Sequence, residues 1–363
     1  MLENQEAEIG GKSSYKRWAE REGIPVIDDF YVPDIRKVAL EPWPRLGGLG
    51  TFLNLVGTGD VNDAYLCEIP AGTSLKPQRH LFEEIIYVVH GRGATSVWRD
   101  GESKQSFEWQ AGSLFSPPLN TWHQHFNGSG SEAARFLVVT TAPIVMNLFH
   151  NVDFVFDNPF EFRDRYAGQE EYFSGKGRHY PGRIWDTNFV SDVRSIPLQD
   201  WKERGAGART ILLELSENIL AALVSEFPVG TYKKAHRHGP GNHVIILGGT
   251  GYSLMWPEGA PVRKYDWSEG TVIVPPENWF HQHFNTGAKP ARYLALRWAG
   301  SKKYLGMRKA YGVDKSTKSG GDQIDYEDED PTIHAQFEKA LADAGARCEM
   351  GGFHPVCSRK GSV

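Results

Sequence analysis

The sequence has little cysteine and no long apolar segment, and both features limit what the protein can be. Its 363 residues include three cysteines, Cys67, Cys348 and Cys357. Three are too few for a disulfide framework, so we expect free thiols and a reducing, cytoplasmic location. The longest apolar runs, such as the one that begins at Ile219, are far shorter than the roughly 20 residues of a membrane-spanning helix. The acidic, polar start of the chain does not resemble a secretory signal.

An excess of basic residues is also missing. The chain has 40 Lys and Arg residues against 45 Asp and Glu residues, which gives a formal net charge of −5. A nucleic-acid partner calls for a clustered basic face, whereas the basic residues here are scattered along the chain. We therefore expect a small-molecule substrate, with no nucleic-acid partner and no membrane partner. The sequence leaves open whether the protein forms a homo-oligomer.

The most informative feature that is present is a long internal repeat. The segment "FEWQAGSLFSPPLNTWHQHFN" and the segment "YDWSEGTVIVPPENWFHQHFN" align with a constant offset, because His281 follows His123 by 281 − 123 = 158 positions. The same offset brings Asp34 onto Asp192 and extends over most of the chain. Solenoid repeats have periods of roughly 20 to 50 residues and need several copies. The repeat therefore predicts a duplicated domain.

Each copy consists of short β-rich runs separated by Gly, Pro and Asn. Many short strands without helical periods between them predict an all-β barrel or sandwich with antiparallel pairing. The expected organisation is a lead-in over residues 1–29, a first β domain over 30–141, an aromatic-rich and packed inter-domain segment over 142–187, a second β domain over 188–299, and a tail over 300–363.

Short helices are predicted only near the ends of the chain. A helix should follow Ser13 or Ser14 in the lead-in and stop at Gly23. In the tail, Asp330 can cap a helix in which Ile333 and later apolar residues recur every four positions. The spacing of Cys348, His354 and Cys357 beyond this helix matches no common zinc pattern, so we expect them to be free tail residues.

Histidines placed two apart indicate a metal site. His236 and His238 stand where a strand begins, and His281 and His283 lie in a later strand of the same copy. Residues i and i+2 of a strand point to the same face, so both pairs can face one cavity. A pocket rich in imidazole suits Fe, Mn, Cu, Ni or Zn better than Mg or Ca. We predict His236, His238 and His281 as the metal ligands.

These residues and their spacing resemble the motifs of the cupin superfamily. The matching positions are Gly230, His236, His238, Gly249, Gly270, Pro276, His281 and Asn285 in the second copy, and Gly72, Gln78, His80, Glu84, Gly91, Gly112, Pro118, His123 and Asn127 in the first. The resemblance implies two tandem double-stranded β-helix (jelly-roll) barrels, an arrangement called a bicupin.

The two copies depart differently from the ligand set that the resemblance implies, which is two histidines, a glutamate and a third histidine. The first copy has Gln78 at the first histidine position. The second copy keeps all three histidines but has Asn242 at the glutamate position, with His243 next to it. We therefore expect the metal in the second copy, and we treat Gln78, His80, Glu84 and His123 as a weaker second site.

The resemblance also suggests a reaction. The "HRH" motif without a glutamate is similar to gentisate dioxygenase-type bicupins, which implies a dioxygenase acting on a small organic acid, such as a hydroxylated aromatic acid. The cofactor would be one divalent transition metal, Fe(II) first and Mn(II) next. His283 or His243 would act as acid or base.

Two other interpretations remain open from the sequence. Glu84 favours a Mn- or Fe-dependent decarboxylase, lyase or isomerase similar to oxalate decarboxylase-like bicupins. The third possibility is a bicupin without catalytic activity that binds or stores a small ligand.

Overall fold

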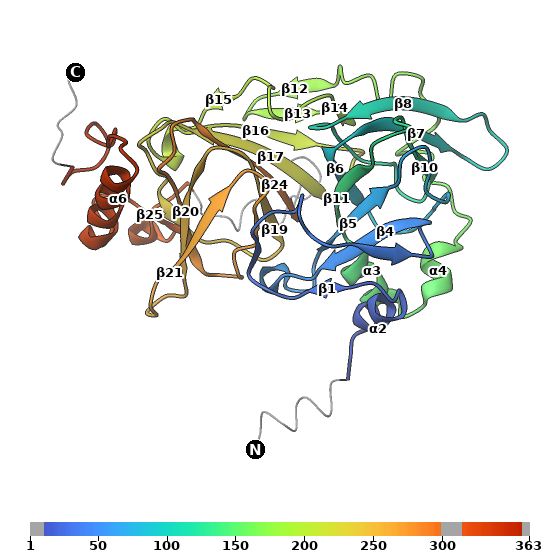
Figure 1. Ribbon diagram of the computed structural model, residues 1–363, viewed down its shortest axis with the longest axis horizontal. Coiled ribbons are helices and arrows are strands. Elements are labelled where there is room, and N and C mark those ends of the chain that lie inside the picture. Colours follow the sequence, from blue (N-terminus) through green and yellow to red (C-terminus); the bar gives the residue numbers. More distant parts are fainter. Residues whose placement is uncertain (1–10, 299–313, 358–363) are drawn as a thin grey trace.

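Two β-barrels lie side by side in the computed structural model, which describes residues 11–298 and 314–357 (Figure 1). The start of the predicted lead-in, the predicted domain boundary at 299 and the tail up to residue 313 lie outside the described residues. The prediction of an all-β fold with short terminal helices is confirmed. Within the described residues no helix has the length and apolarity needed to cross a membrane.

The first barrel joins an eight-stranded sheet, in the order β1-β4-β5-β11-β6-β9-β14 with β3 paired to β4, to a three-stranded sheet in the order β10-β7-β8. Its strands are β1 (Val26–Ile27), β3 (Glu41–Trp43), β4 (Gly48–Leu53), β5 (Asp63–Ile69), β6 (Glu84–His90), β7 (Arg92–Trp98), β8 (Gln105–Gln110), β9 (Leu114–Phe115), β10 (Trp122–Asn127) and β11 (Ala134–Thr140), with the 3-10 turn η1 (Val56–Thr58).

The second barrel repeats this plan. A nine-stranded sheet has the order β12-β13-β16-β17-β24-β19-β22-β2 with β15 paired to β16, and a five-stranded sheet has the order β21-β20-β23-β18-β25. Its elements are β12 (Arg178–Tyr180), β13 (Ile184–Asp186), β15 (Gln199–Asp200), η2 (Lys202–Arg204), β16 (Arg209–Glu214), β17 (Leu220–Phe227), β18 (Ala235–His236), β19 (Asn242–Gly248), β20 (Thr250–Trp256), β21 (Arg263–Ser268), β22 (Val272–Ile273), β23 (Phe280–Asn285), β24 (Ala291–Trp298), η3 (Thr317–Ser319) and β25 (Gln323–Ile324).

The strand registers confirm the duplication. His123 pairs with Val97 in the first barrel, and His281 pairs with Met255 in the second. The two partner residues, Val97 and Met255, are themselves 158 positions apart, since 255 − 97 = 158, so the histidines have the same register in both barrels. The turns agree as well, because Asn120 and Asn278 both have left-handed backbone conformations, with φ of 53° and 61°. Asparagine tolerates this conformation better than most residues.

Each barrel receives its outermost strand from the segment that precedes the other barrel. Strand β2 (Tyr31–Val32) pairs with β22 of the second barrel, and β14 (Phe189–Val190) pairs with β9 of the first. After each strand, an aspartate packs so closely on a glycine of the other barrel that no larger residue fits there. A Cβ atom added to Gly270 would lie 2.5 Å from Asp34, and a Cβ atom added to Gly112 would lie 2.3 Å from Asp192. The repeated Asp and Arg residues before each barrel therefore belong to a reciprocal exchange of strands.

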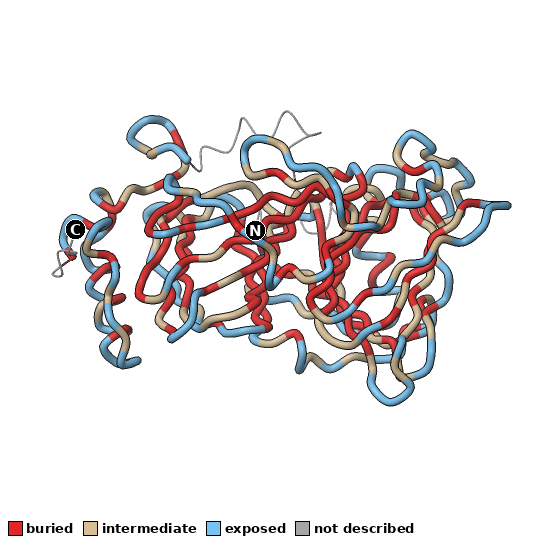
Figure 2. The backbone as a smooth tube through the Cα atoms, turned by 90° about the horizontal axis from the view of Figure 1, so that it is seen from above, coloured by how far each residue is buried: buried red, intermediate tan, exposed pale blue. Residues whose placement is uncertain are grey.

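The two large sheets pack face to face and share one apolar core. Leu66, Leu137 and Val139 of the first barrel lie in the same cluster as Leu213, Val224 and other buried residues of the second. Figure 2 shows many buried segments in the middle of the molecule, with most of the exposed segments in the loops around them. Burial of apolar surface contributes about 25 cal/mol per Å², so this interface fixes the position of one barrel relative to the other.

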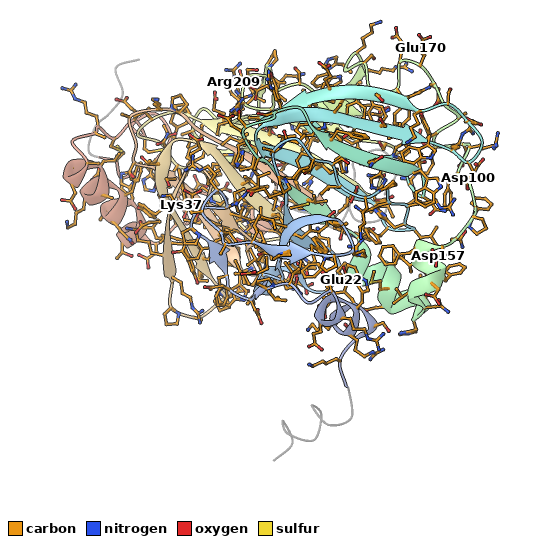
Figure 3. The ribbon with its side chains drawn as sticks, turned by 45° about the vertical axis from the view of Figure 1, so that its right-hand side comes forward. Glu22, Lys37, Asp100, Asp157, Glu170 and Arg209 are labelled. Atoms are coloured by element: carbon orange, nitrogen blue, oxygen red, sulfur yellow. The ribbon has the colours of Figure 1, made fainter. Side chains whose placement is uncertain are left out.

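Helices lie at the outside of the barrels (Figure 1). They are α2 (Ser14–Arg21), α3 (Ala142–Phe149), α4 (Val152–Phe156) and α6 (Pro331–Asp343). The predicted caps are confirmed, because Ser13 accepts a hydrogen bond from the backbone of Lys16, and Asp330 accepts one from Thr332. Glu22, which is labelled in Figure 3, directly follows α2. Its carboxylate accepts hydrogen bonds from Trp43 and Arg45.

The inter-domain segment packs on both barrels. Phe173 stacks on Phe107 of β8 with ring centroids 4.0 Å apart, and Tyr166 is buried. Further along the segment, β12 and β13 join the large sheet of the second barrel, and Tyr180 packs against the core of that barrel.

Candidate metal and substrate site

The structure brings together both sets of predicted metal ligands. His236, His238 and His281 each offer a ring nitrogen within 4.8 Å of the others, and His80, Glu84 and His123 form an equivalent group. In the second barrel the two strands that carry the set are paired, with His236 of β18 directly opposite His281 of β23. The barrel fold thus brings the distant histidines of each copy to one point.

The rings of the second barrel are oriented as metal ligands usually are. His238 Nδ1 lies 2.6 Å from the carbonyl oxygen of Gly239, and His281 Nδ1 lies 3.3 Å from that of Trp279. A carbonyl oxygen only accepts, so each Nδ1 carries the proton and each Nε2 keeps a lone pair. Burial and then the guanidinium groups of Arg297 and Arg204 lower the pKa of His238 to about 4, so the ring stays neutral at pH 7.

Two protein groups already contact these nitrogens. Arg204 Nη2 lies 2.7 Å from Nδ1 and 3.0 Å from Nε2 of His236. The Asn242 amide donates to His238 Nε2 over 3.0 Å. A metal held by all three histidines therefore has to displace Arg204 from His236 and the Asn242 amide from His238, while His281 needs no such change.

A cavity of about 60 Å³ opens beside the three histidines. Its charged lining is cationic, since Arg204 and Arg297 contribute guanidinium groups and no carboxylate occurs among the described lining residues. The remaining lining residues are Trp201, Leu223, His236, His238, Gly239, Pro240, Asn242, Val244, His281, His283, Tyr293, Ala295 and Trp298. A small anion fits this electrostatic environment.

Tyr293, on β24, brings a phenol to the cavity. Its hydroxyl lies 2.9 Å from Nζ of the fully buried Lys233, which also donates to Ser225 over 2.5 Å. Burial alone would raise the pKa of Tyr293, but the neighbouring ammonium of Lys233 outweighs burial and lowers it. A phenol with a lowered pKa beside a cavity is suited to proton transfer.

The site of the first barrel is more enclosed and contains a carboxylate. Glu84 Oε2 lies 3.6 Å from His80 Nε2, and Glu84 Oε1 lies 3.3 Å from His123 Nε2. Both rings direct Nδ1 at backbone carbonyl oxygens, of Phe82 and Thr121, so their lone pairs face the carboxylate.

A cation fits between these three groups. Among the described residues, Glu84 Oε1 and His123 Nε2 are buried without a hydrogen-bond partner. A buried carboxylate that faces two nitrogen lone pairs needs a positive charge between them, and two histidines with one carboxylate are a common iron-binding set.

Gln78, the fourth residue predicted for this site, lies opposite His123 in an isolated β-bridge, but its side chain is engaged elsewhere. Its side-chain oxygen accepts a hydrogen bond of 2.7 Å from Arg45, which also contacts Glu22. The glutamine therefore connects the first barrel to helix α2.

His283, one of the two predicted acid–base residues, lines the cavity of the second barrel. Its Nδ1 lies 2.7 Å from the hydroxyl of Ser253, which accepts a hydrogen bond from Trp267 Nε1. The first barrel repeats this chain with Trp109, Thr95 and His125. The repeated tryptophans are buried in the barrels, as predicted, and they also fix a hydroxyl against the inner histidine.

His243, the other predicted acid–base residue, lies on the opposite face of β19 from the cavity. Its neighbours Asn242 and Val244 are among the described lining residues and His243 is not. On the same side of the strand as His243, Ile245 belongs to the core between the barrels. Both ring nitrogens of His243 are buried without a hydrogen-bond partner among the described residues. This placement does not favour a role in proton transfer.

Replacing His243 by leucine is expected to make the protein less sensitive to acid. Burial lowers the pKa of His243 to about 4, below the value of about 6.5 in an unfolded chain. The folded state then binds fewer protons than the unfolded state between these values, so stability is lost as pH falls from about 6.5 to about 4. Thermal unfolding midpoints measured across this range should fall less steeply for His243→Leu. An unchanged slope would contradict the assignment.

Sequence reasoning missed the cationic residues around the second cavity. Subtracting the repeat offset places Arg204 on Leu46 and Lys233 on Leu75, since 204 − 158 = 46 and 233 − 158 = 75. The strand register places Arg297, which lies opposite Asn242, on Thr140, which lies opposite Glu84. The three counterparts are buried, uncharged residues of the first barrel. Aligning the two copies could have revealed these residues. A charged residue in one copy at a position where the other copy has an uncharged core residue indicates a site that is specific to the charged copy.

Comparison with known proteins finds one family match, which lies in the first barrel. Residues 65–140 match the family model described as "Cupin domain". A search of curated proteins found no match. Solved structures of oxalate decarboxylase are similar at low identity. One, from work on its substrate binding mode and a reaction specificity switch, is 14% identical over 75% of this chain and 78% of that chain, with a TM-score of 0.48.

Two further structures are of the Bacillus subtilis oxalate decarboxylase. A single-residue variant is 12% identical, with a TM-score of 0.48. A structure from work on the Mn(II) centres of that enzyme is 14% identical, with a TM-score of 0.47. Each match covers 75% of this chain and 78% of the other. Similarity at this level does not transfer a reaction, so the function has to be argued from the site itself.

Proposed function

We propose that the chain is a two-barrel protein of the cupin superfamily, and that its second barrel is the active site of a metal-dependent enzyme that cleaves a small carboxylic acid without net oxidation. Decarboxylation is the simplest reaction of this kind. The observation that carries the proposal is the cationic cavity next to three neutral histidines.

The charges of the cavity favour a carboxylate substrate. Arg204 and Arg297 can each donate to carboxylate oxygens, and such charge-assisted hydrogen bonds are stronger than neutral ones. Lys233, one layer deeper, adds to the positive potential. Since no carboxylate occurs among the described lining residues, a bound anion would meet attraction from several sides.

The metal would be held by His236, His238 and His281. When bound, a divalent ion supplies a Lewis acid that polarises the substrate carboxylate. Metal binding would displace Arg204 from His236, and this leaves its guanidinium available to the substrate. Glu84, with His80 and His123, would hold a second ion in the first barrel, where the ligands are almost completely buried.

Tyr293 is the proton donor that the reaction requires. In decarboxylation the carbon–carbon bond breaks, carbon dioxide leaves, and the electron pair remains on the carbon that then takes a proton. The Tyr293 hydroxyl can give that proton, because the ammonium of Lys233 stabilises the phenolate that results. His283 lines the same cavity and is the alternative donor.

A dioxygenase is the second candidate, because three neutral histidines without a carboxylate leave open coordination positions for substrate and dioxygen. The two functions are separated by assaying protein loaded with Mn(II) or with Fe(II) against a panel of C2 to C4 mono- and dicarboxylic acids and hydroxylated benzoic acids. Carbon dioxide release without stoichiometric oxygen uptake would support our proposal. Oxygen uptake in step with substrate loss would replace it with the dioxygenase.

Replacing Arg297 by glutamine is expected to raise KM for the acid by about 10- to 100-fold, because a hydrogen bond to a charged group contributes about 1.5–3 kcal/mol. The change in kcat should be much smaller. Steady-state kinetics would measure both, with Arg263→Gln as the control, since Arg263 is exposed on β21. Equal effects of the two substitutions on KM would count against binding of the substrate by Arg297.

A further inference from the structure

Four potential metal ligands meet on the far side of the second barrel, where the C-terminal segment packs against the five-stranded sheet. His334 and Glu338 lie one turn apart on helix α6, and Cys348 and Cys357 come from the loop that follows it. The four donor atoms lie within 4.8 Å of one another. Neither barrel site uses these residues.

The distances fit one tetrahedral ion. The sulfur atoms of Cys348 and Cys357 are 3.7 Å apart, and a tetrahedral zinc ion with Zn–S bonds of about 2.3 Å separates two sulfurs by about 3.8 Å. His334 Nε2 and Glu338 Oε1 are 3.3 Å apart, against about 3.3–3.4 Å expected for nitrogen and oxygen ligands of the same ion. Cys357 Sγ lies 3.9 Å from Glu338 Oε1.

Hydrogen bonds orient the histidine of this group. Tyr232 has one hydroxyl proton, and its contact of 2.7 Å with the Glu329 carboxylate uses it. The Tyr232 oxygen therefore accepts from His334 Nδ1, 3.1 Å away. Nε2 is left with its lone pair toward the other three ligands, and it is buried without a hydrogen-bond partner among the described residues. Metal-bound histidines are commonly fixed through the other ring nitrogen in this way.

The group lies at the edge of a packed region. His334 and Cys357 are buried, and Glu338 and Cys348 are half-buried. His354 stacks on His334 with ring centroids 4.2 Å apart and reaches Glu329. Phe337 of the helix and Met350 of the loop are fully buried. A site with four protein ligands is typical of structural zinc, whereas catalytic zinc keeps a position open.

A disulfide does not account for the arrangement as well. A sulfur–sulfur bond is about 2.05 Å long, and it would give no reason for the imidazole and the carboxylate to point at the two sulfurs. Two thiolates with a histidine also select zinc over the harder Mn(II) and Mg(II).

We propose that His334, Glu338, Cys348 and Cys357 bind one structural zinc ion that fastens the C-terminal loop to helix α6 and to the second barrel. Within the part of the loop that the structure describes, Glu349 donates a backbone hydrogen bond to Gly230 of the barrel. Met350 packs in the core between the helix and the barrel, and a metal crosslink would add to these contacts.

Metal analysis of the full chain and cobalt substitution test this proposal. The reduced protein should contain zinc that is lost, by about one equivalent, in Cys348→Ser and Cys357→Ser but kept in Cys67→Ala, whose thiol is buried in the first barrel. Cobalt-loaded wild-type protein should show a sulfur-to-cobalt charge-transfer band. The barrel sites contain no sulfur ligand, so the band reports on this site alone and is independent of the function proposed above.

Two results would overturn the zinc site. One is the absence of the charge-transfer band in reduced wild-type protein loaded with cobalt, a measurement that does not depend on how well the variants fold. The other is a Cys348–Cys357 disulfide, found by mass spectrometry, in protein purified with a full zinc complement.

Discussion

Replacing His281 by alanine is expected to lower turnover by at least about a hundredfold, since the loss of residues that only orient a metal ligand already costs 10- to 100-fold. The substitution removes the one predicted ligand whose Nε2 is not contacted by Arg204 or Asn242. The second barrel should lose its metal, and the metal content of the protein, measured together with kcat, would show both effects.

The internal repeat provides a matched control. His123→Ala removes the equivalent ring of the first barrel, since 281 − 123 = 158, and should release the ion held with His80 and Glu84 while turnover is largely retained. The opposite outcome, in which only His123→Ala abolishes turnover, would move the active site to the first barrel.

Replacing Glu83 by alanine is expected to destabilise the protein by about 3–5 kcal/mol, the usual effect of removing one partner of a buried ion pair. One carboxylate oxygen of Glu83 accepts hydrogen bonds from the backbone of Ile219 and Leu220, over 2.7 and 3.1 Å. The other accepts from Arg165 over 3.0 Å. Without the carboxylate, two backbone N–H groups between the barrels lose this acceptor, and the Arg165 guanidinium loses its counter-charge and keeps its hydrogen bonds to Ser216 and Asn218.

Urea unfolding of Glu83→Ala and Glu83→Gln would measure this effect. The glutamine keeps an oxygen that can accept from the backbone groups, so its loss of stability should be smaller than that of the alanine variant. Exposed Glu132→Ala should have almost no effect. A loss below about 1 kcal/mol for Glu83→Ala, a value typical of surface ion pairs, would show that Glu83 does not join the barrels.

Most of the fold could be predicted from the sequence because the chain contains two copies of the same domain, and each strand pattern can be checked in both copies. The paired asparagines at 120 and 278 and the paired histidines at 123 and 281 keep their register only if both copies have the same strands. The exchange of β2 and β14 could not be predicted in this way. Offset pairs such as Asp34 and Asp192 show that two segments are equivalent, but not which barrel each one joins.

A site residue could be predicted where it recurs in both copies of the repeat, or where it lies two positions from another site residue in a strand and so faces the same side. His236, His238 and His281 come together as alternation requires, and Glu84 joins His80 and His123. Arg204 comes from a 3-10 turn outside the motif. The cluster that includes Glu338 and Cys348 escaped prediction because its ligands come from a helix and a loop, with a carboxylate in a position that cysteine and histidine spacing does not reveal.

The reciprocal strands also bear on how such a chain could have arisen. A single barrel expressed alone would lack the strand that the other copy supplies, and its edge would be open to association. Two identical single-barrel chains could satisfy both edges by trading these strands across a twofold axis. The present chain has the geometry of such a homodimer joined end to end, and once joined, one half was free to keep its carboxylate while the other acquired a cationic cavity.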